Sequence, residues 1–463
     1  MLIWRKAGAV VLASSVFAGL GWGSLSVGQE MIEQSESLVR VAVLLPERRE
    51  TARQLGLYPA RPDAAALTPV ADEQNAAVLY EVLDAQIRAE NDGDLPPAGE
   101  LVAFLNFNRR TDENRAAVRK LLERSEDLLR GVREAASRPR CRFTLPADAE
   151  ASADDNLVWT QGYLVRLVLA DAVCAVEDGR VEPAVRSLDV ALRIGRHAAE
   201  RGDYDGLSCR AAAQGGAFAA LAELTRTAGD RLPGVRPRVE GFLSDTPVGA
   251  DALRRAVVPT VRDTLDGLEQ WRDKPFDILE GEFLLDYDPA WRALYELDRR
   301  LTRREWTDGM ESLALDYFCA AYTVLETSPP SSVRDAWTAL RDMDRAFRED
   351  HRDIPRRALP LRYASLPQAV LFAETRRAVA RATLRLYDAS ESDATTDASV
   401  IPGEPIPDPF SPSGDALQLV VTPRGRRLLY SVGTNGTDEG GSLRRMNGTR
   451  GPTEDLVFRL DAP

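Results

Sequence analysis

Two long apolar segments joined by a two-residue turn constrain the fold of this chain more than any other feature. Residues 157–178 and 183–201 both carry apolar side chains at helical spacing, and only Gly179-Arg180 and two further residues separate them. Pro183 suits the first turn of a helix, where the N–H that proline lacks would have no partner. We predict that the two segments form an antiparallel helical hairpin.

Helical periodicity extends over most of the remaining chain. A segment at 207–227 is rich in Ala and Gly, so its backbone can approach a neighbouring helix closely. No second copy of the hairpin recurs at a fixed period, which argues against a repeat array. The pattern predicts a mainly α protein, a multi-helix bundle of helical hairpins. Further helices are expected at 72–90, 111–136, 250–272, 289–303, 306–327, 331–348 and 365–388.

The apolar pattern changes period near the C-terminus. Residues 417–421 and 427–431 are short strand-like runs separated by a Pro- and Gly-containing turn, and 456–460 is a third. They predict a small C-terminal antiparallel β-hairpin and sheet. The preceding segment is rich in Asp, Ser, Thr and Pro, as linkers are. The expected domains are a signal or anchor segment at 1–29, an all-α helical body at 30–387, a linker at 388–407 and a β cap at 408–463.

The N-terminus has the pattern of an export signal. Arg5 and Lys6 precede an uncharged stretch at 7–29, and the first acidic residue is Glu30. The stretch approaches the roughly 20 residues that span a bilayer, which favours an uncleaved anchor. Ser26-Val27-Gly28 offers an alternative cleavage site, which would give a secreted or periplasmic protein. The leading positive charges predict that the body lies on the periplasmic side of the inner membrane.

The charge and cysteine content exclude several classes of function. A net charge of −13 argues against binding of nucleic acid, which needs a concentrated positive field. The chain has only two histidines and no C-x-x-C pair, so a zinc site is not expected. An exported location permits disulfides, but buried free thiols are the simpler interpretation of the four widely spaced cysteines. These are Cys141, Cys174, Cys209 and Cys319.

Three short motifs near the C-terminus resemble those of a known family. Asp408-Pro409-Phe410 precedes Tyr430-Ser431-Val432-Gly433, which runs into the Gly-rich, acidic loop at 435–441. This order resembles the C-terminal sheet of the major pseudopilins of type II secretion. It also looks like the ending of a broad set of uncharacterised exported bacterial proteins with a helical body. In those proteins an NAAxLY-like helix, as at 75–80 here, precedes the hairpin.

The resemblance implies a calcium site in the acidic loop. In the pseudopilin family this loop holds Ca²⁺, which prefers six to eight oxygen ligands. The implied ligands in this chain are Asn435, Asp438 and Glu439. A plain turn is the alternative interpretation, because so few carboxylates make a weak site. The chain lacks the prepilin processing motif and a long helix continuous with the anchor, so we do not expect a pilin subunit.

Other chemically suggestive residues have simpler interpretations. His351-Arg352-Asp353 matches a kinase triplet, but no other kinase motif accompanies it. His197 falls near a predicted helix C-terminus, where an imidazole can bond the last carbonyls. A loop at 276–291 combines aromatic residues with the densest acidic cluster of the chain, as a glycoside hydrolase would need. The cluster consists of Glu280, Glu282, Asp286 and Asp288.

Three functional hypotheses follow from these patterns. The first is a non-enzymatic, membrane-anchored cell-envelope protein whose helical body is an interaction scaffold for other envelope proteins. The second is an envelope hydrolase that uses the acidic and aromatic loop at 276–291. The third is an accessory subunit of a type II secretion or pilus-like system. No catalytic residue and no cofactor other than the calcium ion is assigned.

Overall fold

A computed structural model describes most of the chain and divides it into two compact units. The first unit comprises residues 1–66, 257–329 and 338–364, and the second comprises residues 67–256, 330–337 and 365–463. The described residues are 37–38, 40–58, 70–96, 98–106, 110–142, 152–273, 289–327, 330–352, 363, 365–391, 400–422, 427–436, 438 and 456–460. Only the backbone is described at residues 152–156, 270–273, 289–306, 390–391, 435 and 459.

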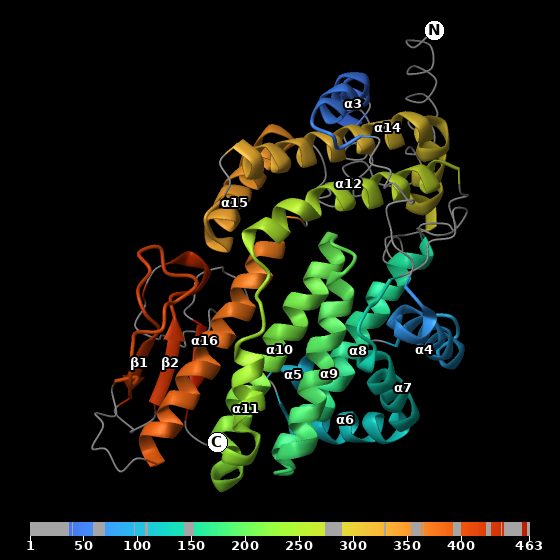
Figure 1. Cartoon of the computed structure of the whole chain (residues 1–463). Helices are drawn as coiled ribbons and strands as arrows, with labels where there is room; N and C mark the ends of the chain where they lie inside the picture. The colour runs from blue at the N-terminus through green and yellow to red at the C-terminus, as the bar shows by residue number, and fades with distance from the viewer. Residues whose placement is uncertain are drawn as a thin grey trace. The chain divides into compact units, whose positions relative to one another are not determined.

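The predicted helical hairpin forms the centre of the second unit. Helix α8 (Ser152–Glu177) and helix α9 (Val181–Ala199) pack side by side, as Figure 1 shows. The turn between them depends on Gly179, whose φ of +67° is a conformation that a Cβ atom disfavours. Its backbone N–H donates to the carbonyl of Val176 and closes the end of α8. The prediction of a hairpin is therefore confirmed.

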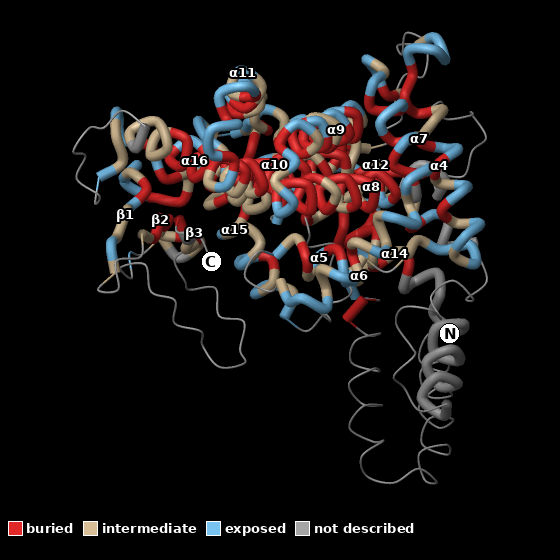
Figure 2. Tube along the Cα trace, turned by 90° about the horizontal axis from the view of Figure 1, so that it is seen from below, coloured by how far each residue is buried: buried red, intermediate tan, exposed pale blue. Residues whose placement is uncertain are grey.

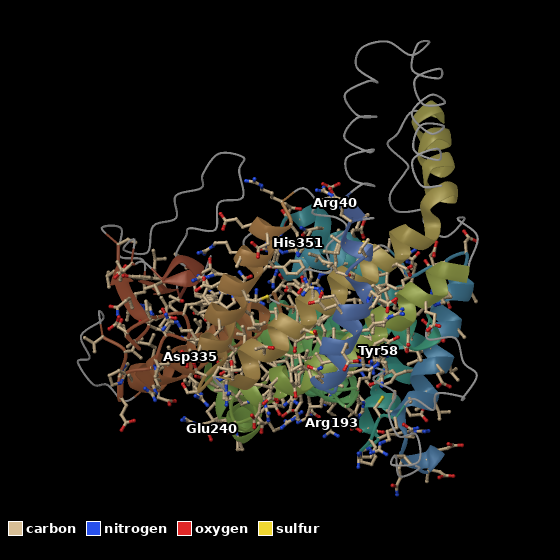
Figure 3. All side chains as sticks on the ribbon, turned by 90° about the horizontal axis from the view of Figure 1, so that it is seen from above. Arg40, Tyr58, Arg193, Glu240, Asp335 and His351 are labelled. Carbon is tan, nitrogen blue, oxygen red and sulfur yellow. The ribbon has the colours of Figure 1, made fainter. Side chains whose placement is uncertain are left out.

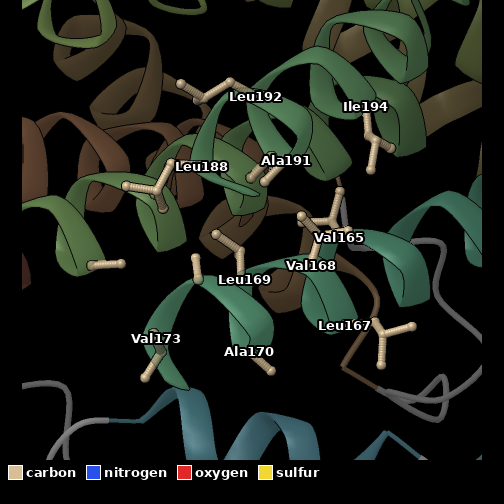
Figure 4. Close-up of a cluster of buried hydrophobic side chains, with 14 of the residues drawn as sticks. Val165, Leu167, Val168, Leu169, Ala170, Val173, Leu188, Ala191, Leu192 and Ile194 are labelled. Carbon is tan, nitrogen blue, oxygen red and sulfur yellow. The ribbon is translucent and has the colours of Figure 1, made fainter. Parts of the chain in front are cut away.

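Two further helices complete a layer with this hairpin. Helix α10 (Tyr204–Ala228) packs on α8 and α9, and helix α16 (Ser365–Glu391) packs on α10. Asp203 caps α10, because its carboxylate accepts a hydrogen bond from the Gly206 N–H at 2.7 Å. The interior of the layer is buried, as Figure 2 shows, and it is filled by apolar side chains, of which Figure 4 shows a cluster. It contains Leu164, Leu167, Leu188, Ile194, Phe218 and Leu221, all nearly inaccessible to solvent.

The small residues of α10 permit the close helix packing that the sequence predicts. A Cβ atom at Gly206 would lie 2.3 Å from the carbonyl oxygen of Ala198 on α9. A Cβ atom at Gly216 would lie 2.3 Å from a methyl carbon of Leu169 on α8. Glycine at these positions brings the helix axes closer than a side chain would permit, and so increases the buried area between them.

Shorter helices surround the layer within the second unit. They are α4 (Ala76–Glu90), α5 (Gly99–Leu105), α6 (Asp112–Arg124), α7 (Glu126–Ser137) and α11 (Leu232–Leu243). The single helix expected at 111–136 is in fact two helices, because the chain leaves helical geometry at Ser125 (ψ +18°). The sequence patterns do not predict helices at α5 and α11. Pro237 lies inside α11, although prolines usually mark loops.

The predicted C-terminal sheet is also present. Strands β1 (Gln418–Val421), β2 (Arg427–Ser431) and β3 (Leu456–Arg459) form an antiparallel sheet in the order β1-β2-β3. Leu429 at its centre pairs with Leu419 on β1 and Phe458 on β3. The apolar face packs on Ala378, Val379 and Ala382 of α16, together with Ile406, Leu417 and Leu460. A mainly α fold with a small C-terminal sheet is confirmed.

The first unit contains α3 (Leu45–Gln54), most of α12 (Ala250–Asp273), α14 (Pro289–Thr327) and most of α15 (Val333–Asp350). Helix α14 is continuous, whereas separate helices at 289–303 and 306–327 were expected. The junction contains neither Gly nor Pro, so nothing in it interrupts the backbone hydrogen bonds. Arg49 holds α3 against α14 by two hydrogen bonds to the Glu311 carboxylate, at 2.7 and 2.8 Å.

The predicted N-terminal anchor at 1–29 lies outside the described residues. Residues 392–399 of the predicted linker also lie outside them. The expected division into body, linker and cap therefore stays a prediction. One described segment, Leu157–Glu177, is long and apolar enough to cross a membrane. Because 78% of its most apolar window is buried inside the protein, it has the surroundings of a core helix.

Candidate functional site

The acidic loop implied to bind calcium is described only in part. Asp438 is exposed, and one of its carboxylate oxygens accepts a hydrogen bond from the Tyr430 hydroxyl at 3.1 Å. Asn435 ends the short helix η7 (Gly433–Asn435), but its side chain and Glu439 lie outside the described residues. Among the described residues, no three His, Cys, Asp or Glu side chains come close enough to hold a metal ion. Calcium binding by this loop stays a prediction.

The Asp-Pro-Phe motif has a structural role. The buried Asp408 carboxylate accepts hydrogen bonds from the Phe410 N–H at 2.9 Å and from the Ser431 hydroxyl and Val432 N–H, both at 2.8 Å. Phe410 packs edge-on against Trp337 and Phe372. Asp408 therefore joins two of the motifs that resemble pseudopilins, and it fixes the end of β2 to the turn before the sheet.

The residues considered for enzymatic chemistry do not form a described site. Glu280, Glu282, Asp286 and Asp288 all lie outside the described residues, so the hydrolase hypothesis gains no geometry from the structure. His351, labelled in Figure 3, lies with its Nε2 3.4 Å from the Asp316 carboxylate, which also pairs with Arg48. Through the Asp316 carboxylate this arrangement joins α3, α14 and the end of α15, and it is not a kinase catalytic loop.

His197 is buried and hydrogen-bonded on both sides of its ring. Nε2 lies 3.0 Å from the carbonyl oxygen of Arg138, which can only accept, so Nε2 carries the proton. Nδ1 then accepts from the Tyr80 hydroxyl at 3.0 Å. Burial lowers the pKa of the imidazole below 6.5 and keeps it neutral. His197 therefore connects α4, α9 and the end of α7, and its use is structural.

All four cysteine side chains are buried free thiols, as the simpler interpretation held. Burial raises the pKa of Cys174 and Cys319 to about 11 and that of Cys209 to about 12. These side chains are thus protonated at neutral pH and are poor nucleophiles.

The second unit leaves one face of its central helix uncovered. On α10 a stripe of small residues at helical spacing is partly or fully accessible to solvent, whereas most of the other residues of the helix are buried. The stripe consists of Ser208, Ala212 and Ala219, and it runs past Gly216, which packs on Leu169 of α8. It faces away from α9, because α9 contacts the opposite side of α10 at Gly206 and Ala213.

Accessible residues of α8 and α16 border this stripe. On α8, Trp159, Gly162 and Arg166 follow one helical face, and the Trp159 side chain is 52% exposed. On α16, Arg376 lies on the side next to α10, and one of its nitrogens lies 3.1 Å from where a Cβ atom of Gly215 would be. We call the stripe and these four residues, Trp159, Gly162, Arg166 and Arg376, the open face.

The two arginines of the open face differ from most others in the unit. Arg236, for example, binds the Asp388 carboxylate with both terminal nitrogens at 2.8 Å. Within the described residues, neither Arg166 nor Arg376 makes a hydrogen bond or an ion pair. Surrounding protein nevertheless lowers the pKa of Arg376 by desolvation. This guanidinium is therefore accessible and partly desolvated, and no described carboxylate binds it.

Comparison with known proteins adds no identification. No protein-family model matches the chain, and neither a curated protein nor a solved structure matches it. The resemblance to the pseudopilin C-terminus therefore stays a prediction, and the open face must be interpreted from its own chemistry.

No sequence pattern singles out the residues of the open face. The Ala- and Gly-rich composition of α10 indicates close packing, but it does not show which side stays uncovered. Trp159 and Arg166 fit the periodicity of an ordinary helix. Whether a described carboxylate pairs with Arg166 or Arg376 depends on the positions of acidic residues far away in the sequence, which only the fold determines.

Proposed function

We propose that this protein is a non-enzymatic, membrane-anchored scaffold of the cell envelope, and that it binds another protein through the open face. The observation that carries the proposal is an exposed Trp159 on one face with Arg166 and Arg376, which form no ion pair with any described residue. Trp and Arg are the residue types most enriched among energetically dominant interface residues. The accessible small residues between them let a bound chain approach the backbone of α10 closely.

The buried polar groups support a scaffold in preference to an enzyme. His197 and Asp408 are both held by partners within the chain. A catalytic group needs a lone pair or proton that it can present to a substrate. These groups instead use their lone pairs and protons in hydrogen bonds within the protein. The hydrolase alternative depends entirely on the loop at 276–291, whose four acidic residues lie outside the described residues.

Site-specific photocross-linking in intact cells tests the proposed interface. A photoreactive residue at Ala212 lies on the open face, and one at Arg186 is a matched control on the exposed side of α9. We expect a discrete protein adduct from position 212 and none from position 186. Equal adducts from both positions, or none from position 212, would overturn the proposal.

The membrane location is tested by separating the cells into fractions. We expect the full chain to stay with the inner membrane after an alkaline wash, and a variant without residues 1–29 to leave the membrane fraction. The full chain found in the periplasmic fraction would show that the segment is cleaved. Adducts to secretion or pilus components would support the accessory-subunit alternative.

A further inference from the structure

The open face also indicates the chemistry of its partner. We propose that it binds an acidic peptide segment of another protein, whose carboxylates pair with Arg166 and Arg376 while an apolar side chain packs on Trp159. This inference rests on the proposed function and specifies the partner that the scaffold recognises.

The positions of the two arginines place both guanidinium groups beside the stripe. A nitrogen of Arg166 lies 3.7 Å from where a Cβ atom of Gly162 would be, so the side chain runs back along α8 toward the turn of Trp159. Arg166 also lies close enough to Cys209 of α10 to act on the electrostatics of that thiol. Arg376 reaches α10 at Gly215, about 9 Å further along the helix axis at 1.5 Å per residue.

This spacing suits an extended peptide better than a single small anion. An extended chain rises about 3.3 Å per residue, so acidic residues two or three positions apart can reach both arginines. A phosphate ion would satisfy one guanidinium, but it would leave the other arginine unpaired and Trp159 exposed. A peptide can satisfy both charges and also cover the aromatic ring and the stripe.

The charge of the whole chain argues for local recognition. With a net charge of −13, the protein repels anionic membranes and nucleic acid at long range. A short peptide carries only a few charges, so bidentate arginine–carboxylate pairs at contact distance can exceed this repulsion. The guanidinium of Arg376 is already partly desolvated, so less water has to be displaced when a carboxylate binds to it.

Peptide binding to the purified full chain tests the inference. The probe is a fluorescein-labelled peptide of alternating glutamate and leucine, followed by fluorescence polarisation, and the control peptide replaces each glutamate by glutamine. We expect the glutamate peptide to bind and the glutamine peptide to bind at least about tenfold more weakly. The double variant Arg166→Gln, Arg376→Gln should bind the glutamate peptide about tenfold or more weakly than the wild type, as expected for two lost charged pairs.

Matched variants separate this loss from unfolding. Arg186→Gln removes an exposed charge of α9 and should leave peptide binding unchanged. Ala212→Phe fills the stripe and should reduce peptide binding while both arginines remain. Circular dichroism verifies that each variant keeps its helical content. Equal binding of the two peptides, or a double variant that binds like the wild type, would overturn the inference.

Two further probes exclude other anionic ligands. Phosphatidylglycerol vesicles that bind in an Arg376-dependent manner, while the glutamate peptide does not, would assign the face to a lipid surface and overturn the inference. If millimolar inorganic phosphate displaced the peptide completely, the open face would be a site for small anions and the inference would be overturned. If photoadducts form at position 212 but the cross-linked partner segment contains no acidic residue, the scaffold function stands and this inference fails.

Discussion

Two polar regions of the second unit use their charged groups in opposite ways. Around Asp408 the carboxylate is buried, and it accepts three hydrogen bonds from the chain itself. On the open face, Arg166 and Arg376 are accessible and make no hydrogen bond or ion pair within the described residues. The first region stabilises the fold, whereas the charged groups of the second are available to bind another molecule. The two regions differ in whether the charged group already has hydrogen-bond partners in the chain. Residue type alone does not separate them.

Removing the buried carboxylate should have the largest effect on stability. Asp408→Ala leaves the buried Ser431 hydroxyl and Val432 N–H without an acceptor, at a cost of about 1–3 kcal/mol for each group. We expect the free energy of unfolding, measured in urea, to fall by about 2–4 kcal/mol. Asp415→Ala is the control, because that exposed carboxylate bonds only the hydroxyls of Ser411 and Ser413. Equal losses in the two variants would remove the distinction between the regions.

A glycine that permits close packing should give the next largest effect. Gly206→Ala places a Cβ atom 2.3 Å from the carbonyl oxygen of Ala198, so α9 and α10 must move apart. We expect a loss of about 1–3 kcal/mol in thermal unfolding. Gly241→Ala in α11 meets no atom within 4 Å and should stabilise the protein by about 0.5–1 kcal/mol. A neutral Gly206→Ala would contradict the described packing of α9 on α10.

The pair of His197 and Tyr80 should make stability depend on pH. Burial lowers the pKa of His197 in the folded protein, whereas the unfolded chain titrates near 6.5. The unfolded chain therefore binds more protons below pH 6.5, so this stabilisation is complete above pH 6.5 and is lost as the pH falls toward the folded pKa. Urea unfolding at pH 7.5 and pH 5.5 measures the difference, and His197→Gln should reduce it.

The smallest effect on stability is expected on the open face. Because no described residue forms a hydrogen bond or ion pair with Arg376, Arg376→Gln should change the free energy of unfolding by less than about 0.5 kcal/mol. Chemical unfolding of the full chain measures this change. A loss as large as that in Asp408→Ala would show that Arg376 supports the fold, and the contrast between the two regions would disappear.

The candidate site was less predictable from the sequence than the fold. The motif Asp408-Pro409-Phe410 was recognised, but its resemblance pointed to a calcium loop and not to the hydrogen bonds that the buried Asp408 makes. Trp159 and Arg376 carry no local signal, because solvent exposure and ion pairing are properties of surroundings built from distant segments. Helix α11 is not predicted from the sequence for a similar reason. Its internal Pro237 indicates a loop when the packing around it is unknown.

The sequence by itself determined the mainly α class, the hairpin at 157–201 and the three strands of the sheet. Each depends on periodicity and turn residues that act within a few positions, as at Gly179. Only the tertiary structure decided that α10 is central, that α16 lies beside it and that one stripe of α10 stays uncovered. It also decided which charges find partners, because hydrogen bonds and ion pairs join side chains brought close in space from distant parts of the chain.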